Sequence, residues 1–228
     1  MKKNYLLLLV IVIASFGVKA QLTAPFTESF NSTATLPSTW TAAATAGTAW
    51  QVTGTPGYAG ATIADHTGTA GSTFAWVDFS GTNTNITLTS DTIDVSALTT
   101  PEFSFWFNNN LGTNVITPLN LLYVEVNNGT AWVTIDSIQQ DNMGNWSEHF
   151  YNVSSHVFSN KVIVRLRAES GGHSADYYQD FTIDDISVLE TPSCRNPVAL
   201  SAKYITSTTA TLAWNAGPTA DTAWSVEY

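Results

Sequence analysis

The sequence predicts an all-β protein in which a two-sheet antiparallel sandwich is followed by the start of a second, incomplete β domain. Apolar residues alternate with polar ones at period two in short runs, and almost no run has helical periodicity. Asn, Gly, Thr, Ser and Pro separate the runs. Only 11% of the 228 residues are charged and 12% are aromatic, which suits strands with a packed inner face and a hydroxyl-rich outer face.

Residues 1–20 predict a signal peptide. Lys2 and Lys3 precede an apolar run over 6–13, and Val18-Lys19-Ala20 places small residues where a signal peptidase reads, so that Gln21 begins the mature chain. The alternative is a buried N-terminal helix or a retained anchor. No second apolar stretch approaches the length of a membrane span, so we expect a soluble chain that is secreted or held at the cell surface.

Ten strands are predicted between residues 21 and 190, with the spacing of a two-sheet sandwich. They are expected at 26–30, 50–52, 73–79, 86–95, 103–107, 121–126, 131–138, 146–153, 161–169 and 180–189. In the clearest alternation, Val162, Val164, Leu166 and Ala168 alternate with Lys161, Ile163, Arg165 and Arg167.

Three local features refine this pattern. Phe103, Phe105 and Phe107 are expected on one face of their strand, with Trp106 on the other. Asn128-Gly129 is the strongest hairpin signal in the chain. The polar stretch 41–72 is expected to be loop with short strands, and its length favours a functional loop.

A domain boundary is predicted near Glu190. Residues 191–197 carry two prolines and break the strand pattern, as a linker does. A new alternating pattern starts at Val198, and its next strands are expected at 209–214 and 224–228. Because a sandwich domain has about 100 residues, the domain over 198–228 is expected to be truncated and the chain to be a fragment of a longer protein.

Several motifs between Phe26 and Glu190 recur together in one known family. They are Phe26-Thr27-Glu28-Ser29-Phe30, Trp40, Trp50, Asp65-His66-Thr67, Phe74-Ala75-Trp76, Phe103-Ser104-Phe105-Trp106-Phe107, Trp132, Trp146 and the most specific, Asp180-Phe181-Thr182-Ile183-Asp184-Asp185-Ile186. This region resembles a MAM domain, a jelly-roll adhesion module. It is also similar to the cleaved-adhesin jelly rolls of bacterial surface proteases and haemagglutinins, whose openings resemble Phe30 through Leu36-Pro37-Ser38-Thr39-Trp40.

The sequence departs from these families in two respects. The four cysteines usual in animal MAM domains are absent, and Cys194 is the only cysteine. The acidic loop that cleaved adhesins often carry is replaced by 41–48, which contains no acid. After the linker, Thr209-Ala210-Thr211-Leu212-Ala213-Trp214 and Trp224-Ser225-Val226-Glu227-Tyr228 resemble the first strands of a fibronectin type III domain, which implies a spacer or adhesive module.

The acids of the last predicted strand are the leading candidates for a site. Adjacent strand residues face opposite sides, so one of Asp184 and Asp185 is expected to point inward or to a sheet edge. A buried carboxylate is costly, and a hard cation offsets that cost. The resemblance implies a structural Ca²⁺ site where the first and last strands meet, which adds Glu28, with Asp65 and Asp78 as further donors. The alternatives are two solvated acids, or an acid bonded to backbone amides.

Signals for catalysis and for nucleic-acid binding are missing from the sequence. The net charge is −10, and nucleic-acid binding needs a basic face. The four histidines lack metalloprotease spacing, there is no G-x-S-x-G, and Cys194 lies in the predicted linker. His66 is expected to be a packed or hydrogen-bonding residue rather than a base.

We therefore expect a non-catalytic adhesion or interaction module whose partner is an extracellular protein or glycan. Two alternatives remain open from sequence. One is a carbohydrate-binding accessory domain of a secreted hydrolase, with an exposed tryptophan stacking on sugar. The other is the non-catalytic part of a surface protease whose catalytic domain lies outside this chain.

Overall fold

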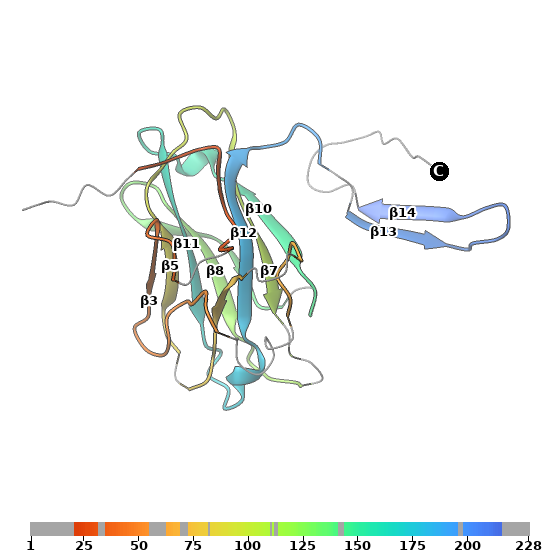
Figure 1. Ribbon diagram of the computed structural model, residues 1–228, viewed down its shortest axis with the longest axis horizontal. Coiled ribbons are helices and arrows are strands. Elements are labelled where there is room, and N and C mark those ends of the chain that lie inside the picture. The colour runs from red at the N-terminus through yellow and green to blue at the C-terminus, as the bar shows by residue number, and fades with distance from the viewer. Residues whose placement is uncertain are drawn as a thin grey trace, which may run out of the picture.

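The computed structural model describes residues 21–31, 35–54, 63–68, 73–81, 83–109, 111, 114–140, 144–195 and 198–215. The predicted signal peptide and the strand expected at 224–228 lie outside this part of the chain. The described residues form two packed sheets and a separate hairpin (Figure 1). They include no helix long and apolar enough to cross a membrane.

One sheet has seven strands and the other has five. The first contains β1 (Leu22–Thr23), β3 (Trp40–Ala43), β5 (Ile86–Ser90), β6 (Ile93–Asp94), β8 (Leu121–Asn127), β9 (Trp132–Ile138) and β11 (Lys161–Glu169). The second contains β2 (Phe26–Glu28), β4 (Ala75–Val77), β7 (Pro101–Asn109), β10 (Ser147–Asn152) and β12 (Phe181–Glu190). Short 3-10 turns lie at η2 (Ser154–His156) and η3 (Asp176–Tyr178).

The predicted two-sheet sandwich is confirmed, and its pairing is antiparallel with one exception. The two-residue β1 runs parallel to β6, with Leu22 opposite Ile93. These two parallel strands need no helical crossover, because the chain between them forms strands of the other sheet, β2 and β4, before it comes back to β6. The stretch 41–72, expected to be loop with short strands, begins with residues of β3, and Trp40 at the start of that strand is opposite Ser90 of β5. The strand expected at 50–52 is reduced to a bridge between Gln51 and Trp76.

The core lies between the sheets and follows the period-two pattern. In β11, buried residues alternate strictly with half-buried ones, as predicted. Phe103, Phe105 and Phe107 of β7 are fully buried, whereas Trp106 on the opposite face is partly exposed. The three phenylalanines of β7 therefore pack into the core, and Trp106 lies on the outer face of the five-stranded sheet.

The predicted hairpin at Asn128-Gly129 is also confirmed. It joins β8 to β9, and the Asn128 side chain accepts hydrogen bonds from the backbone N–H groups of Thr130 and Ala131. Gly129 has φ of 88°, and a Cβ there would lie 2.9 Å from the ring of Phe158. Glycine is required at this position both for its backbone conformation and for the close approach of the ring.

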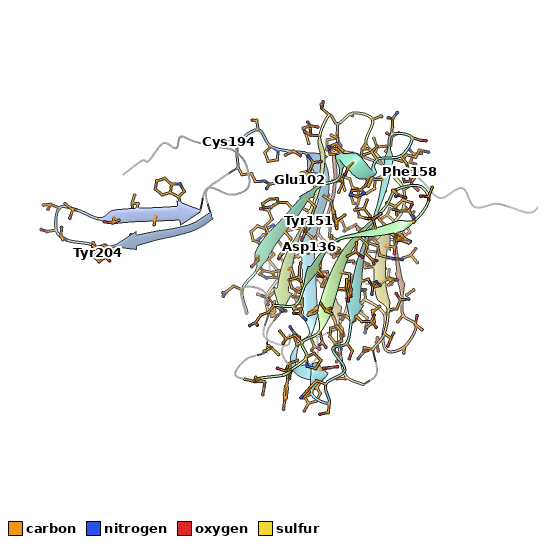
Figure 2. The ribbon with its side chains drawn as sticks, turned by 180° about the vertical axis from the view of Figure 1, so that it is seen from behind. Glu102, Asp136, Tyr151, Phe158, Cys194 and Tyr204 are labelled. Atoms are coloured by element: carbon orange, nitrogen blue, oxygen red, sulfur yellow. The ribbon has the colours of Figure 1, made fainter. Side chains whose placement is uncertain are left out.

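A hydrogen bond links edge strands of the two sheets. Tyr151 of β10 donates its hydroxyl to Asp136 of β9 at 2.7 Å, and its ring lies 6.2 Å from that of Phe105 in the core (Tyr151 and Asp136 are labelled in Figure 2). A hydrogen bond between edge strands therefore joins the two sheets, in addition to the apolar core between them.

The segment after β12 is anchored to the sandwich through Arg195. This side chain forms an ion pair with Glu102, and its guanidinium lies 3.6 Å from the centroid of the Phe150 ring. Cys194 beside it is an exposed free thiol. Beyond this anchor, β13 (Val198–Lys203) and β14 (Thr211–Asn215) form an antiparallel hairpin that projects from the sandwich (Figures 1 and 2).

The hairpin matches the first two strands predicted for the second domain. It exposes three large apolar side chains, those of Tyr204, Ile205 and Leu212. A hairpin of this kind occurs in many β domains. The fibronectin type III assignment therefore stays a prediction.

Candidate functional site

A β-bulge in β12 brings the two predicted acids to one place. The register with β7 shifts between Asp184 and Ser187, and Asp185 has φ of 45°. Asp184 is fully buried and Asp185 half-buried, in line with the expectation that one of the two acids points inward. The bulge interrupts strand alternation, so the two carboxylates still reach one neighbour. Both carboxylates contact the same residue, His66.

His66 belongs to the segment 63–68, which lies over the outer face of the five-stranded sheet. Its backbone N–H donates to Asp184 Oδ2 at 3.2 Å, and its Nδ1 lies 2.6 Å from Asp185 Oδ2. Its ring stacks on Trp106 with a centroid separation of 3.7 Å and an interplanar angle of 20°. Trp146 adds a hydrogen bond from its indole N–H to the carbonyl of Ala64. The segment is thus held to the sheet by hydrogen bonds and ring contacts together.

Asp65 brings a third carboxylate close to this pair. One of its oxygens accepts a hydrogen bond from the Thr67 hydroxyl at 2.5 Å. The other, Oδ2, is buried and has no hydrogen-bond partner in the structure. An unpaired buried carboxylate oxygen is unusual, since such a group loses its hydration without compensation.

The environment of Asp184 strongly favours its protonated form. Burial raises the pKa of Asp184 to about 8, and the nearby charges of Asp185 and Asp65 act in the same direction. Backbone N–H groups of Asp185 and His66 oppose the shift in pKa by bonding the carboxylate. Asp184 is therefore predominantly neutral at pH 7 in the protein without a bound cation.

The other two predicted ligands make local contacts instead. Glu28 lies opposite Ile186 in β2, and its carboxylate accepts the N–H of Phe30 at 2.9 Å. Asp78 accepts the N–H of Ser80 at 2.7 Å. Within the described ranges, no contact joins Glu28 or Asp78 to the other predicted acids, and no three His, Cys, Asp or Glu side chains are grouped as a metal site.

The donor chemistry of the cluster fits a hard cation even so. Asp65 offers a buried oxygen without a partner, and Asp184 is a carboxylate whose neutral form is imposed by burial and by neighbouring negative charge. A divalent ion would relieve both costs. The residues that would hold it are Asp65 and Asp184, with Asp185 beside them.

Sequence reasoning identified His66 as a packed, hydrogen-bonding residue, but not its partners. Trp106 and Trp146 were read as strand residues, and the stacking of Trp106 on His66 depends on contacts between segments far apart in sequence. The His66 ring itself contacts Asp185, Trp106 and Trp146.

The two sheets and the anchored segment define a β-sandwich module of the jelly-roll type. Over residues 29–195 the sequence matches the family described as MAM domain, meprin/A5/mu. The match covers most of the chain, which therefore belongs to the MAM domain family, as its motifs predicted.

Similar solved structures include two carbohydrate-binding modules and a bacteriophage tailspike domain. One is TmCBM61 in complex with β-1,4-galactotriose, with 13% identity, a TM-score of 0.47, and coverage of 68% of this chain and 90% of that one. A family 6 carbohydrate-binding module has 11% identity and a TM-score of 0.37, covering 75% and 98%. The enzymatically active domain of tailspike protein 4 of bacteriophage CBA120 has 13% identity and a TM-score of 0.38, covering 67% and 19%. No curated protein matches the sequence.

Proposed function

We propose that this chain is a non-catalytic binding module of an exported protein, with an extracellular protein or glycan as its partner. The main support for the proposal is that His66, Asp184 and Asp185 hold the segment 63–68 against the five-stranded sheet. His66 is stacked on Trp106 and bonded to both Asp184 and Asp185, so its groups are committed to structure. Membership of the MAM family supports the same reading.

The domain plan belongs to this proposal. Residues 1–20 are a signal peptide, 21–190 the MAM-like domain, 191–197 a linker and 198–228 the truncated start of a fibronectin type III domain. The Arg195 contacts with Glu102 and Phe150 support a short, fixed junction between the two domains.

The proposal predicts no hydrolytic activity in the mature chain. Protein expressed from Gln21 to Tyr228 should leave casein, nitrophenyl esters and nitrophenyl glycosides uncleaved at the rate of a buffer blank. The His66–Asp185 pair is the arrangement closest to a catalytic one, so His66→Gln is the informative variant. Cleavage that copurifies with the protein and disappears in His66→Gln would contradict a non-catalytic role.

Structural calcium binding at Asp65 and Asp184 is a second part of the proposal. A ligand that binds only the folded state at a hundredfold excess over Kd adds about 2.7 kcal/mol. In a protein of this size that corresponds to a rise in Tm of about 5–10 °C. Thermal melts in millimolar CaCl₂ and in EDTA should show this rise for the wild type. Asp65→Asn, which removes the unpaired carboxylate oxygen, should abolish it.

Asp78→Asn is the matched control for the calcium melt, because Asp78 was a predicted ligand but, within the described part of the chain, bonds only the N–H of Ser80. It should keep the full rise in Tm. An equal rise in wild type and Asp65→Asn would place any bound ion elsewhere, and a wild type without a rise would exclude calcium from the fold.

A further inference from the structure

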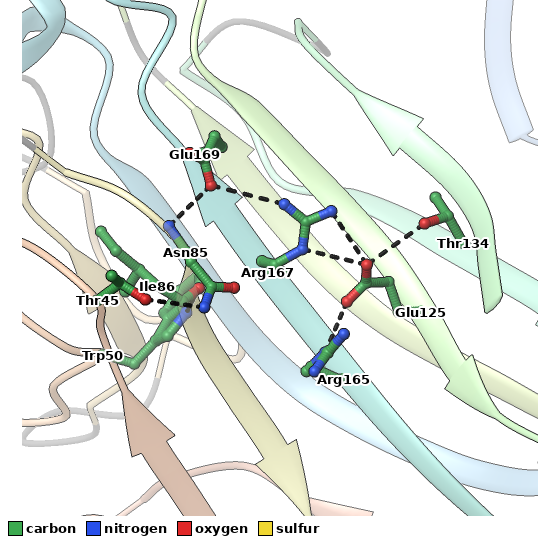
Figure 3. A network of polar contacts seen from close by, with 9 residues as sticks. All are labelled: Thr45, Trp50, Asn85, Ile86, Glu125, Thr134, Arg165, Arg167 and Glu169. Carbon is green, nitrogen blue, oxygen red and sulfur yellow. Dashed lines mark hydrogen bonds and ion pairs between the residues drawn. The ribbon is translucent and has the colours of Figure 1, made fainter. Parts of the chain in front are cut away.

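The outer face of the seven-stranded sheet carries an arrangement of charged and aromatic side chains that the candidate site does not use. Arg165 and Arg167 of β11 flank the carboxylate of Glu125 on β8 (Figure 3). Arg165 Nε lies 2.6 Å from Glu125 Oε2, and Arg167 donates to Oε1 from Nε and Nη2 at 3.1 and 3.0 Å. The guanidinium of Arg165 lies 3.9 Å from the ring centroid of Trp132, and that of Arg167 lies 4.0 Å from that of Tyr123.

Further contacts fix this arrangement in place. Arg167 Nη1 lies 3.5 Å from Glu169 Oε2, which also accepts the backbone N–H of Asn85 at 2.7 Å. The Asn85 amide donates in turn to Thr45 at 3.0 Å (Figure 3). Both guanidinium groups are therefore positioned before any ligand arrives, which lowers the entropy lost on binding.

Stability alone gives a weak reason for this arrangement. The Glu125 side chain is only 5% exposed, and a buried ion pair is often no more stabilising than apolar residues of similar size. Such a pair also fixes the orientation of a guanidinium. Arg165 has the orientation that a ligand would need, because its Nε bonds Glu125 while its two terminal amino groups make no hydrogen bond to the described residues.

Threonine hydroxyl groups lie on both sides of Arg165 across the same face of the sheet. In register, Thr134 of β9 is opposite Glu125, Arg165 is opposite Thr89 of β5, and Thr89 is opposite Thr41 of β3. These five residues form one row across five strands, which we call the cross-strand row. With neighbouring strands about 4.8 Å apart, the row is about 19 Å long.

The chemistry of the row selects the kind of ligand. The charges of Arg165 and Arg167 are balanced by those of Glu125 and Glu169, so the face is locally neutral in a chain of net charge −10. A polyanion finds no excess positive charge here. The large apolar side chains that are exposed among the described residues, Val115, Tyr204, Ile205 and Leu212, all lie off this face. On the face itself, the rings of Trp132 and Tyr123 are covered by the two guanidinium groups.

We propose that the cross-strand row binds a neutral oligosaccharide laid across the strands, with Arg165 donating hydrogen bonds to sugar hydroxyls and the threonines completing the contacts. Planar guanidinium donors and hydroxyls beside an aromatic ring match the hydroxyl-rich surface of a sugar chain. The inference rests on the proposed function, because it assigns the face and the ligand class of the binding module.

The test is a glycan array that carries neutral and anionic oligosaccharides, probed with protein expressed from Gln21 to Tyr228. The strongest neutral binder is then titrated by calorimetry. Arg165→Gln should weaken that binding at least tenfold, and Thr89→Val severalfold. Arg195→Gln is the matched control, since Arg195 also pairs with a carboxylate and covers a ring, but on the other sheet. It should bind as the wild type does.

Circular dichroism and thermal melts of each variant separate lost binding from lost folding, and Thr89→Val removes a single hydroxyl if Arg165→Gln proves unstable. An array on which no neutral oligosaccharide binds would overturn the inference, as would neutral binding that is unchanged in both Arg165→Gln and Thr89→Val. Binding only to anionic glycans would also overturn it. Each of these results leaves the proposed binding module standing, whereas the hydrolysis assay tests that role separately.

Discussion

Replacing Phe181 with alanine is expected to lower the free energy of unfolding by about 3–5 kcal/mol, the usual cost of removing a buried phenylalanine side chain. Phe181 is fully buried at the start of β12. Its ring makes edge-on contacts with Phe79 at 4.9 Å and with Phe107 at 5.2 Å. The substitution therefore removes apolar burial and two favourable ring contacts, and it leaves a cavity between segments that cannot readily collapse.

Urea denaturation of protein expressed from Gln21 would measure this loss, with an unchanged m-value as evidence that the unfolding transition is the same. Val115→Ala is the matched control, because Val115 is 89% exposed and its loss should stay within about 0.5 kcal/mol. A loss below about 1 kcal/mol for Phe181→Ala would be incompatible with a core centred on these rings.

The sequence predicted the sandwich well because strand alternation is a local signal. The alternation over 161–169 and the inward row of phenylalanines in β7 both appear in the structure as predicted. β3 was not among the ten strands placed from sequence, because three of its four residues, 41–43, are threonine and alanine, which carry little apolar signal. Its position is set by pairing with β5, so only the partner strand makes it recognisable.

The candidate site was predictable only in part. The Asp184-Asp185 motif and Asp65 could be chosen from sequence, but their meeting at His66 depends on a bulge that arises from pairing between distant strands. The local role of Asp78 could have been inferred from sequence, since an Asp that accepts a hydrogen bond from the backbone N–H two residues later is a common turn motif.

The cross-strand row could not be derived from sequence at all. The alternation separates Arg165 from Val162, Val164 and Leu166 on its strand, and the structure has those three buried. The alignment of Arg165 with the other members of the row requires the register of four strand pairs. Because a shift of one residue moves a side chain to the opposite face, this register cannot be inferred from composition or local pattern.

Stability in EDTA is expected to fall as the pH rises from about 4 to about 8, because of Asp184. Its pKa is raised from 3.8 to about 8 in the folded protein, chiefly by burial. Between these values the folded state binds a proton that the unfolded state has released. The free energy of unfolding therefore decreases with pH, by at most about 1.4 kcal/mol per pH unit for one group and by less where solvent screens the charge.

Asp184→Asn separates this effect from other titrations. The variant keeps the shape of the side chain but carries no ionisable proton, so its stability should depend less on pH and should exceed that of the wild type above pH 8, where the buried acid is forced to ionise. Asp78→Asn, which alters an acid whose only hydrogen bond is a local turn contact, should retain the slope of the wild type. Urea melts at pH 5, 6.5 and 8.5 would compare the three proteins. If the wild type becomes more stable between pH 5 and 8.5 in EDTA, or if Asp184→Asn keeps the full slope, the Asp184 carboxyl is ionised in the folded protein and burial does not control its protonation.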